Sequence, residues 1–293
     1  MKKGQKRKPD WLKVKVPGGA GYKRIDRYHR EQGLNTVCRS AACPNQGECW
    51  GNGTATFMIL GDRCSRNCGF CNVAHNDLLP PDPDEAKKVA SAIAELKLQH
   101  AVVTSVTRDD LDDGGARQFC DLVSAIHDMA PDCKIELLIP DLQGNRAALA
   151  EILAAGPDIL GHNLETVPRL YEKARQGADY NRSLYLLRNA GEIAPHIPTK
   201  SGLMLGMGET LPEVEQTLHD LHTTGCSMLT LGQYLAPTRN HLPVARYVTP
   251  QEFLELKRLA DKLGFAHVEA GPLVRSSYHA EKQLQEAAHG DNN

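Results

Sequence analysis

The sequence predicts an α/β protein built as a partial barrel with an extension at each end. From about residue 54 onward, short runs rich in β-branched apolar residues alternate with stretches of helical periodicity, and no Ser/Gly-rich linker interrupts them. This alternation is typical of parallel strands covered by helices. We count about six or seven such units and expect a partial (β/α)6 TIM-like barrel over residues 54–272, with extensions over 1–53 and 273–293.

The expected strands are the apolar, β-branched runs. They cover residues 54–60, 101–106, 134–139, 158–163, 199–205 and 228–234, and a late strand is considered over 266–269. The expected helices cover 84–98, 115–129, 146–155, 182–194, 212–223 and 250–263. Pro212 and Pro250 suit the first turn of a helix, where a missing N–H costs no hydrogen bond.

Residues 1–53 show little periodicity and hold three cysteines. We expect an extension that is ordered by something bound to it. The basic run at its start has no apolar stretch after it, so it predicts neither a signal peptide nor a convincing transit peptide.

Composition excludes several classes of protein. Lys and Arg total 34 against 36 Asp and Glu, a net charge of -2, so there is no overall positive field to attract nucleic acid. No window approaches the roughly 18 apolar residues of a membrane helix. We expect a soluble, cytoplasmic protein of bacterial type, with neither a nucleic-acid nor a membrane partner.

The cysteines are the strongest signal. Six of the nine lie between positions 38 and 71, in two triads: Cys38, Cys43 and Cys49, then Cys64, Cys68 and Cys71. An odd count without a secretory signal disfavours a disulfide framework, so we interpret the thiols as metal ligands.

Three ligands per group favour an iron-sulfur cluster over zinc. Structural zinc sites normally take four protein ligands, whereas a four-iron cluster can leave one iron to another partner. A zinc knuckle remains the alternative. The second triad, C-x3-C-x2-C, follows the first expected strand, which places it at the C-terminal mouth of the barrel. Phe70 could shield it from water.

The other candidate residues each have an ordinary structural explanation. The acidic run after the second strand, with Arg108 and four aspartates from Asp109 to Asp113, fits either a helix N-terminus or a functional loop. The glycines at 202, 206 and 208 fit a tight turn or a turn that approaches a nucleotide. Cys120, Cys133 and Cys226 are expected to be buried free thiols.

The segment Cys64-Ser-Arg-Asn-Cys68-Gly-Phe-Cys71 resembles the signature of the radical S-adenosylmethionine enzymes. The resemblance implies that the open iron is chelated by the methionine part of S-adenosylmethionine, and that one electron from the cluster breaks the sulfonium bond. The resulting radical abstracts hydrogen.

The first triad, within Cys38-Arg-Ser-Ala-Ala-Cys43-Pro-Asn-Gln-Gly-Glu-Cys49, resembles the auxiliary-cluster motif of the lipoyl synthase family. Further blocks resemble this family: 104–115, 162–168, 200–209, 233–238 and 275–278. No ligand position departs from the family pattern. The resemblance implies insertion of two sulfur atoms at carbons six and eight of a protein-bound octanoyl-lysine, with a second 4Fe-4S cluster as the sulfur source.

The family also implies particular site residues. The auxiliary cluster takes its fourth ligand from a serine of Arg275-Ser-Ser-Tyr278, and we choose Ser276, although the resemblance does not firmly separate it from Ser277. From physics alone either serine would instead cap a final helix over 278–288. Contacts to S-adenosylmethionine are expected from Phe70, Thr104, Asn163, Glu165, Met204, Gly206 and Tyr234.

The implied protein partners are octanoylated lipoyl-carrier domains, namely 2-oxoacid dehydrogenase subunits and the glycine cleavage carrier protein, and an electron donor such as ferredoxin or flavodoxin. Two alternative classes are less favoured. Another radical sulfur-inserting enzyme, related to biotin synthase or the methylthiotransferases, is disfavoured because the extra triad precedes the cofactor-binding one. A non-enzymatic metal protein or electron carrier would not cleave S-adenosylmethionine.

Overall fold

The computed structural model describes residues 7–14, 18–40, 43–51, 56–75 and 77–278. Its centre is a sheet of seven parallel strands in the order β1-β4-β5-β6-β7-β8-β9. The strands are β1 (Thr56–Ile59), β4 (His100–Ser105), β5 (Lys134–Leu138), β6 (Ile159–Gly161), β7 (Thr199–Leu205), β8 (Met228–Gln233) and β9 (His267–Gly271). Each strand neighbours the next in the chain, and β1 and β9 end the order, so the barrel is open between them. The predicted α/β partial barrel is confirmed.

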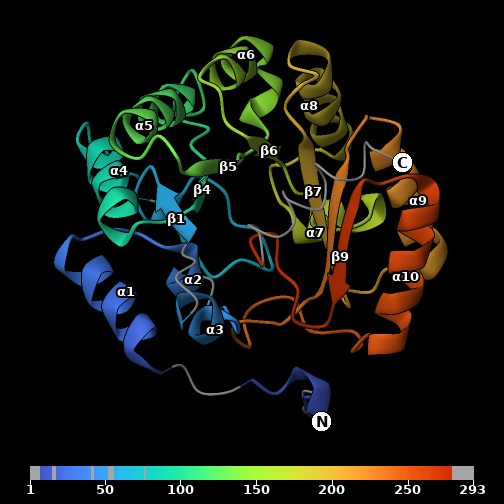
Figure 1. The fold of residues 1–293 in the computed structure, drawn as a ribbon. Helices are drawn as coiled ribbons and strands as arrows, with labels where there is room; N and C mark the ends of the chain where they lie inside the picture. Colours follow the sequence, from blue (N-terminus) through green and yellow to red (C-terminus); the bar gives the residue numbers. More distant parts are fainter. Residues whose placement is uncertain (1–6, 15–17, 41–42, 52–55, 76, 279–293) are drawn as a thin grey trace.

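Helices connect these strands and lie in an arc outside them (Figure 1). They are α4 (Glu85–Leu96), α5 (Ala116–Met129), α6 (Arg146–Ala154), α8 (Tyr180–Ile193), α9 (Leu211–His222) and α10 (Pro250–Leu263). All six lie within a few residues of their predicted bounds. Capping boxes of Thr210 with Glu213 and Thr249 with Glu252 begin α9 and α10, and a proline occupies the first turn of each.

Short elements decorate the connections. They are a small parallel pair of β2 (Arg63–Cys64) and β3 (Ala74–His75), α7 (Tyr171–Ala174), and the 3-10 turns η1 (Asp10–Leu12), η2 (Leu142–Gly144) and η3 (Pro168–Leu170). No helix within the described ranges is long and apolar enough to cross a membrane.

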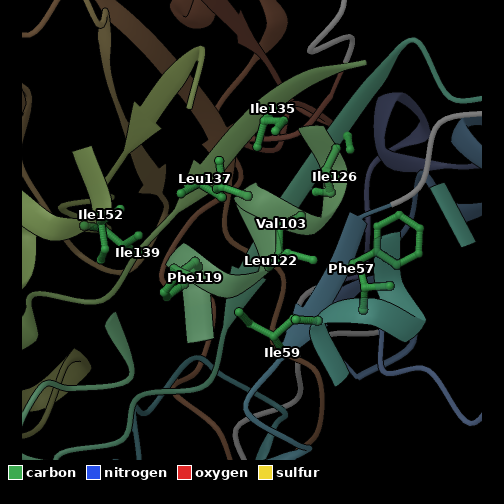
Figure 2. Close-up of a cluster of buried hydrophobic side chains, with 14 of the residues drawn as sticks. Phe57, Ile59, Val103, Phe119, Leu122, Ile126, Ile135, Leu137, Ile139 and Ile152 are labelled. Carbon is green, nitrogen blue, oxygen red and sulfur yellow. The ribbon is translucent and has the colours of Figure 1, made fainter. Parts of the chain in front are cut away.

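The outer face of the sheet packs against the helices. Phe57 pairs in register with Val103, and Val103 with Leu137, so these side chains form one row under α5. Figure 2 shows Phe119 and Leu122 of α5 beside this row, and all five side chains are fully buried. Each contributes roughly 1.5–3 kcal/mol by leaving water, which fixes the strand ends that carry the site.

The described part of residues 1–53 is helical, which the weak periodicity of this segment did not predict. Helices α1 (Ala20–Glu31), α2 (Val37–Ser40) and α3 (Gln46–Gly51) occupy the described part of this extension. The centroids of the Tyr22 and His29 rings lie 5.3 and 5.4 Å from that of the fully buried Trp50. The apolar face of α1 was missed because aromatic rings and a histidine form it, with Ile25 its one large aliphatic side chain.

The extension also covers the edge of the barrel. Thr36 pairs antiparallel with Phe57, and the N–H of Met58 donates to the Asn35 carbonyl at 3.0 Å. Backbone groups of β1 that would otherwise be unpaired are thereby satisfied. Packing on β1 and around Trp50 brings the first cysteine triad beside the barrel. That a bound group orders the extension stays a prediction.

Candidate functional site

The sequence-predicted site residues gather where the parallel strands end. The loop after β1 carries Cys64, Cys68 and Cys71, and residues at or beyond the ends of β4, β6, β7 and β8 supply the others: Thr104, Asn163, Glu165, Met204, Gly206 and Tyr234. In barrels of this kind, catalytic groups lie at this end of the strands.

Backbone hydrogen bonds hold the cysteine loop against the barrel. The N–H of Ser65 donates to the Thr107 carbonyl at 2.9 Å, and that of Gly69 to the Ala174 carbonyl at 2.9 Å. The N–H of Leu242 donates to the Gly69 carbonyl at 2.8 Å. Gly69 lies close to two segments, because a Cβ there would stand 3.0 Å from Leu242 Cγ and 3.1 Å from the Lys173 carbonyl oxygen. The middle of the loop is therefore fixed on both sides.

Arg66, between two of the cysteines, anchors the loop through its side chain. Its guanidinium donates to both carboxylate oxygens of Asp109, at 2.6 and 2.7 Å, and to both of Asp141, at 2.9 and 2.7 Å. Arg182 donates to Asp141 at 3.0 Å. Burial alone would raise the pKa of the fully buried Asp141, but its bonds to Arg66 hold that pKa well below its usual range. Sequence analysis missed Arg66, Asp141 and Arg182.

The acidic run after β4 plays two roles. Asp109 binds Arg66 as described, while Asp113 accepts from the N–H groups of Gly115 and Arg117 at 2.8 and 2.9 Å. Asp113 thus caps the start of α5. The helix-capping role is observed for Asp113, Asp109 anchors the cysteine loop through Arg66, and a role of this run in ordering cofactor or substrate stays a prediction.

The three thiols of the loop lie close enough to affect one another. Burial is the largest influence and raises the pKa of Cys68 to about 12 and that of Cys71 to about 11. Cys64 and Glu165 raise both values further, while Arg175 lowers that of Cys68. Such thiols keep their protons unless a cation replaces them, which is what iron does when a thiolate binds it.

Glu165, which follows β6, is the acidic side chain that influences the thiols of Cys68 and Cys71. Its φ of 67° is strained for a residue with a side chain, and two backbone bonds to β7 hold it: its N–H to the Gly202 carbonyl at 2.9 Å, and Met204 N–H to its carbonyl at 2.8 Å. Asn163 donates to its carboxylate at 3.1 Å. Burial is the largest influence on the pKa of Glu165 and raises it, against the opposing effects of Arg175 and Asn163.

Asn163 points an unused acceptor into the same region. Its Oδ1 is buried and has no hydrogen-bond partner among the described residues. A Cβ at Gly202 would lie 3.0 Å from this oxygen, so the glycine leaves space beside it. A buried polar atom without a partner is costly, and it fits an amino or hydroxyl group of a bound cofactor.

Arg175, also missed from the sequence, is held by a buried polar network. Its Nη1 donates to the Tyr171 hydroxyl at 3.0 Å and to the Ser183 hydroxyl at 3.2 Å. His162 contacts Ser183 at 3.0 Å and the Ile139 carbonyl at 2.9 Å. Burial lowers the pKa of His162 to about 3, so this ring is neutral. The network fixes a cation beside Cys68.

The glycine turn after β7 is closed on itself. The N–H groups of Gly206, Met207 and Gly208 all donate to the Glu209 carboxylate, at 2.5, 2.9 and 3.0 Å. These amides are therefore engaged within the turn, and a cofactor contact at Gly206 would have to use its carbonyl or its Cα surface.

The other expected cofactor contacts are placed as follows. Thr104 donates to the Leu138 carbonyl at 2.8 Å, and the Tyr234 hydroxyl donates to the Leu242 carbonyl at 2.8 Å. Burial raises the pKa of Tyr234 to about 12. Met204 and Phe70 are half-buried. Tyr234 thus supports Leu242, which in turn holds the cysteine loop.

The first triad forms a second small site. Cys38 lies in α2 and Cys49 in α3, with Cys43 between them. The Cys43 N–H donates to the Cys38 carbonyl at 3.0 Å, and burial, followed by Cys38, raises the pKa of Cys43. A narrow pocket joins this site to the C-terminal segment, and its lining is Cys38, Cys43, Asn45, Gln46, Cys49, Thr56, Arg275, Ser277 and Tyr278.

The serines of the C-terminal segment take different positions. Ser277 lines the pocket beside the three cysteines, and Ser276 is not part of the described lining. The expected final helix over 278–288, which either serine would cap, lies outside the described residues apart from Tyr278.

Arg275 connects the two sites. Burial is the largest influence on its pKa and lowers it, while Cys43 and Glu165 both raise it. Glu165 in turn influences Cys68 and Cys71. The Nη1 of Arg275 would lie 3.2 Å from a Cβ at Gly232 of β8, so this side chain reaches from the pocket of the first triad to the barrel. Asn72, next to Cys71, donates to the Ser40 carbonyl of α2 at 2.8 Å, so the segments that carry the two triads lie side by side.

The thiol spacing bears on the zinc alternative. Among the described residues, no group of three or more His, Cys, Asp or Glu side chains is arranged to hold a single metal ion. Thiolates on one zinc stand about 3.8 Å apart, given tetrahedral bonds of about 2.3 Å. In a four-iron cluster each thiolate binds a different iron, which requires wider spacing. Three thiols are the donor set that a four-iron cluster takes when its fourth iron has another partner.

Two family models and several lipoyl synthases match the chain. The model of the Radical SAM superfamily matches residues 58–221, and that of the N-terminal domain of lipoyl synthase matches residues 1–43. The lipoyl synthase of Methylobacillus flagellatus is 52% identical over 282 residues, 96% of this chain and 87% of that one. The lipoyl synthase of Methylococcus capsulatus is 55% identical over 278 residues, 94% and 86% of the two chains.

Solved structures share the fold. Methylornithine synthase aligns with a TM-score of 0.56 at 15% identity, covering 82% of this chain and 73% of its own. HydG, a maturase of the [FeFe]-hydrogenase, aligns with a TM-score of 0.55 at 14% identity, covering 90% and 63%.

A partial barrel with three cysteines after its first strand, matched by the superfamily model, makes this protein a radical S-adenosylmethionine enzyme. It therefore uses S-adenosylmethionine and a 4Fe-4S cluster. Identity above one half over nearly the whole length narrows the class further: the chain belongs to the lipoyl synthase family. It is a sulfur-inserting enzyme of lipoate biosynthesis, and its substrate is a lipoyl-carrier protein.

Proposed function

We propose that the chain inserts sulfur at carbons six and eight of an octanoyl-lysine by means of two 4Fe-4S clusters that face one interior. Cys64, Cys68 and Cys71 would hold the cluster that binds S-adenosylmethionine, and the first triad would hold the auxiliary cluster. The observation that carries this proposal is the position of Arg275, which lines the pocket of the first triad and reaches β8, where a Cβ at Gly232 would stand 3.2 Å from its Nη1.

The chemistry explains why two centres must share a chamber. An unactivated C–H bond offers neither an acidic proton nor an electrophilic carbon, so acid, base and nucleophile are ineffective. When bound, the first cluster supplies the electron that cleaves S-adenosylmethionine, and the second supplies sulfur. The protein must exclude water and hold the acyl carbon between the centres, and the cysteine loop, fixed by Arg66 and Gly69, provides a rigid wall.

For the fourth auxiliary ligand we now propose Ser277 in place of Ser276. The support is the pocket lining, which includes Ser277 together with all three cysteines. A serine oxygen is a harder and ordinarily more basic ligand than a thiolate, so it should leave iron more readily than a fourth cysteine would. A weakly held iron suits a cluster that must give up sulfide.

S-adenosylmethionine would lie over the strand ends. The unpartnered Oδ1 of Asn163 and the strained, buried Glu165 are the groups that best support this placement. Thr104, Met204, Gly206, Tyr234 and Phe70 border the same end of the barrel and remain proposed contacts.

The proposed carriers are the octanoylated domains of 2-oxoacid dehydrogenases and of the glycine cleavage system, and the proposed electron donor is a ferredoxin or flavodoxin. The proposed compartment is the cytoplasm, where ligand thiols stay reduced.

Two substitutions test the division between the triads. Cys68→Ala should abolish cleavage of S-adenosylmethionine, whereas Cys43→Ala should retain part of that cleavage and lose thiolation. The assay is anaerobic reconstitution followed by mass analysis of an octanoyl-lysine peptide, which should gain two sulfurs and lose two hydrogens. Equal loss of both activities in both variants would contradict the proposal, as would a wild-type chain that binds only about four irons rather than about eight.

A further inference from the structure

We propose that Tyr278 is a positioning residue of the auxiliary site, which acts with Asn45 to keep Ser277 within reach of the iron. The inference rests on the proposed function, because it presumes that Ser277 is the fourth ligand. The inference explains how a serine of the C-terminal segment stays beside a cluster that cysteines of the N-terminal extension would hold.

Two hydrogen bonds bracket the serine. The side-chain amide of Asn45 donates to the Leu273 carbonyl at 2.6 Å, and the Tyr278 hydroxyl donates to Glu48 Oε1 at 3.0 Å. Ser277 lies between the two bonded positions in sequence. The segment is thus fastened on both sides of its proposed ligand.

Both fastenings reach the auxiliary loop itself. Asn45 lies between Cys43 and Cys49 and is 3% exposed, and its carbonyl accepts from the Cys49 N–H at 2.9 Å. Glu48 directly precedes Cys49. A movement of the serine segment is therefore coupled to the residues that present two of the three thiols.

The barrel fixes the path by which the segment arrives. A Cβ at Gly232 of β8 would lie 2.1 Å from the Val274 carbonyl oxygen, so the chain passes directly over a position without a side chain. The N–H of Tyr278 donates to the Arg275 carbonyl at 2.9 Å, which closes a turn around both serines. Tyr278 ends the path that begins at β9.

A bracket of this kind suits a ligand that must hold iron and later release it. Chain ends fray unless they are tied down, and an untied serine would lose ordering entropy each time it bound. A hydrogen bond contributes only about 1 kcal/mol, so two of them hold the segment without locking it. Loss of one of these hydrogen bonds should raise the population of the detached segment about five-fold.

The test uses the full-length, anaerobically reconstituted protein and the rate at which a ferrous chelator removes iron before turnover. Tyr278→Phe deletes only the hydroxyl and should speed release of about one iron per chain about five-fold. Cleavage of S-adenosylmethionine without acyl substrate should stay at the wild-type rate. Asn45→Asp, which exchanges the donor for an acceptor, should give the same lability.

Two control variants separate positioning from general damage. Glu48→Gln keeps an oxygen that can accept from Tyr278 and should release iron at the wild-type rate. Tyr185→Phe removes the hydroxyl of a tyrosine that is 48% exposed on α8 and should also match wild type. If Tyr278→Phe and Asn45→Asp both release iron as wild type does, while the protein holds about eight irons, the inference is overturned and the proposed function survives. A wild-type content of about four irons overturns both.

Discussion

Replacement of Arg66 tests whether side-chain charge holds the cysteine loop in place. Arg66→Met keeps a long apolar stem and removes four hydrogen bonds to two carboxylates. Removing one partner of a buried ion pair costs about 3–5 kcal/mol, because a buried charge is left behind. Asp141 keeps bonds from Arg182 and from Gln143 N–H, at 3.0 and 3.1 Å. We therefore expect the lower end, about 3 kcal/mol.

The loss can be measured by thermal unfolding of the cluster-free protein. At about 2–4 °C per kcal/mol for a chain of this size, Arg66→Met should lower Tm by about 6–12 °C. Adding Asp141→Asn removes the buried carboxylate that Arg182 alone compensates only in part, and should restore about half of the loss. A Tm within about 2 °C of wild type, or no recovery in the double variant, would refute the electrostatic account of the loop.

Two further predictions concern the polar network and the C-terminal segment. Burial lowers the pKa of His162 from 6.5 to about 3, so below pH 6.5 the unfolded chain binds a proton that the folded chain does not, and stability falls as pH drops. From pH 6.5 to 5 the loss amounts to about 2 kcal/mol. His162→Gln should therefore flatten that part of the curve of unfolding free energy against pH. Gly232→Ala should reduce thiolation more than cleavage of S-adenosylmethionine, because its methyl group would displace the Val274 carbonyl, while Gly271→Ala, whose added Cβ would meet only Val274 Cγ2 at 3.4 Å, serves as the control.

The order of strands and helices could be predicted because the central strands of the barrel, such as β4, β7 and β8, are buried on both faces. The burial pattern of β4, with five of its six residues buried, appears in the sequence as a continuous apolar run. Helices between such runs show a period of 3.6 residues. Helix α1 was missed because its buried face is made of Tyr22, Ile25 and His29, which an aliphatic pattern does not reveal.

The site was predictable where its residues follow strands, and unpredictable where they pair across the chain. Six cysteines within 34 positions are a local signal. Arg66 meets Asp109 and Asp141 at separations of 43 and 75 residues, and no local pattern encodes such pairs. Lys200 is the first residue of a segment that resembles the family. Its buried ammonium donates to Glu136 of β5 at 2.8 Å, a pairing across 64 positions that the sequence did not predict.

The choice between two adjacent serines shows the same limit. Neighbouring residues in an irregular segment point in different directions, and the direction depends on the turn they occupy. Val274 crosses Gly232, and the turn from Arg275 to Tyr278 follows. Only this path distinguishes Ser277, which lines the pocket, from Ser276.

Each of the two cysteine triads has one arginine side chain beside it. Arg175 and Arg275 are held by hydroxyl and carbonyl groups, and neither takes part in an ion pair among the described residues. Glu165 raises the pKa of both arginines, so two cations share one carboxylate, and a buried cation that is only partly compensated is costly. Arg175 lowers the pKa of Cys68, and Arg275 that of Cys43, so each triad has one arginine beside it. Three thiolates bound to iron would add negative charge beside each arginine, and both arginines would then be stabilised by the groups that the triads hold.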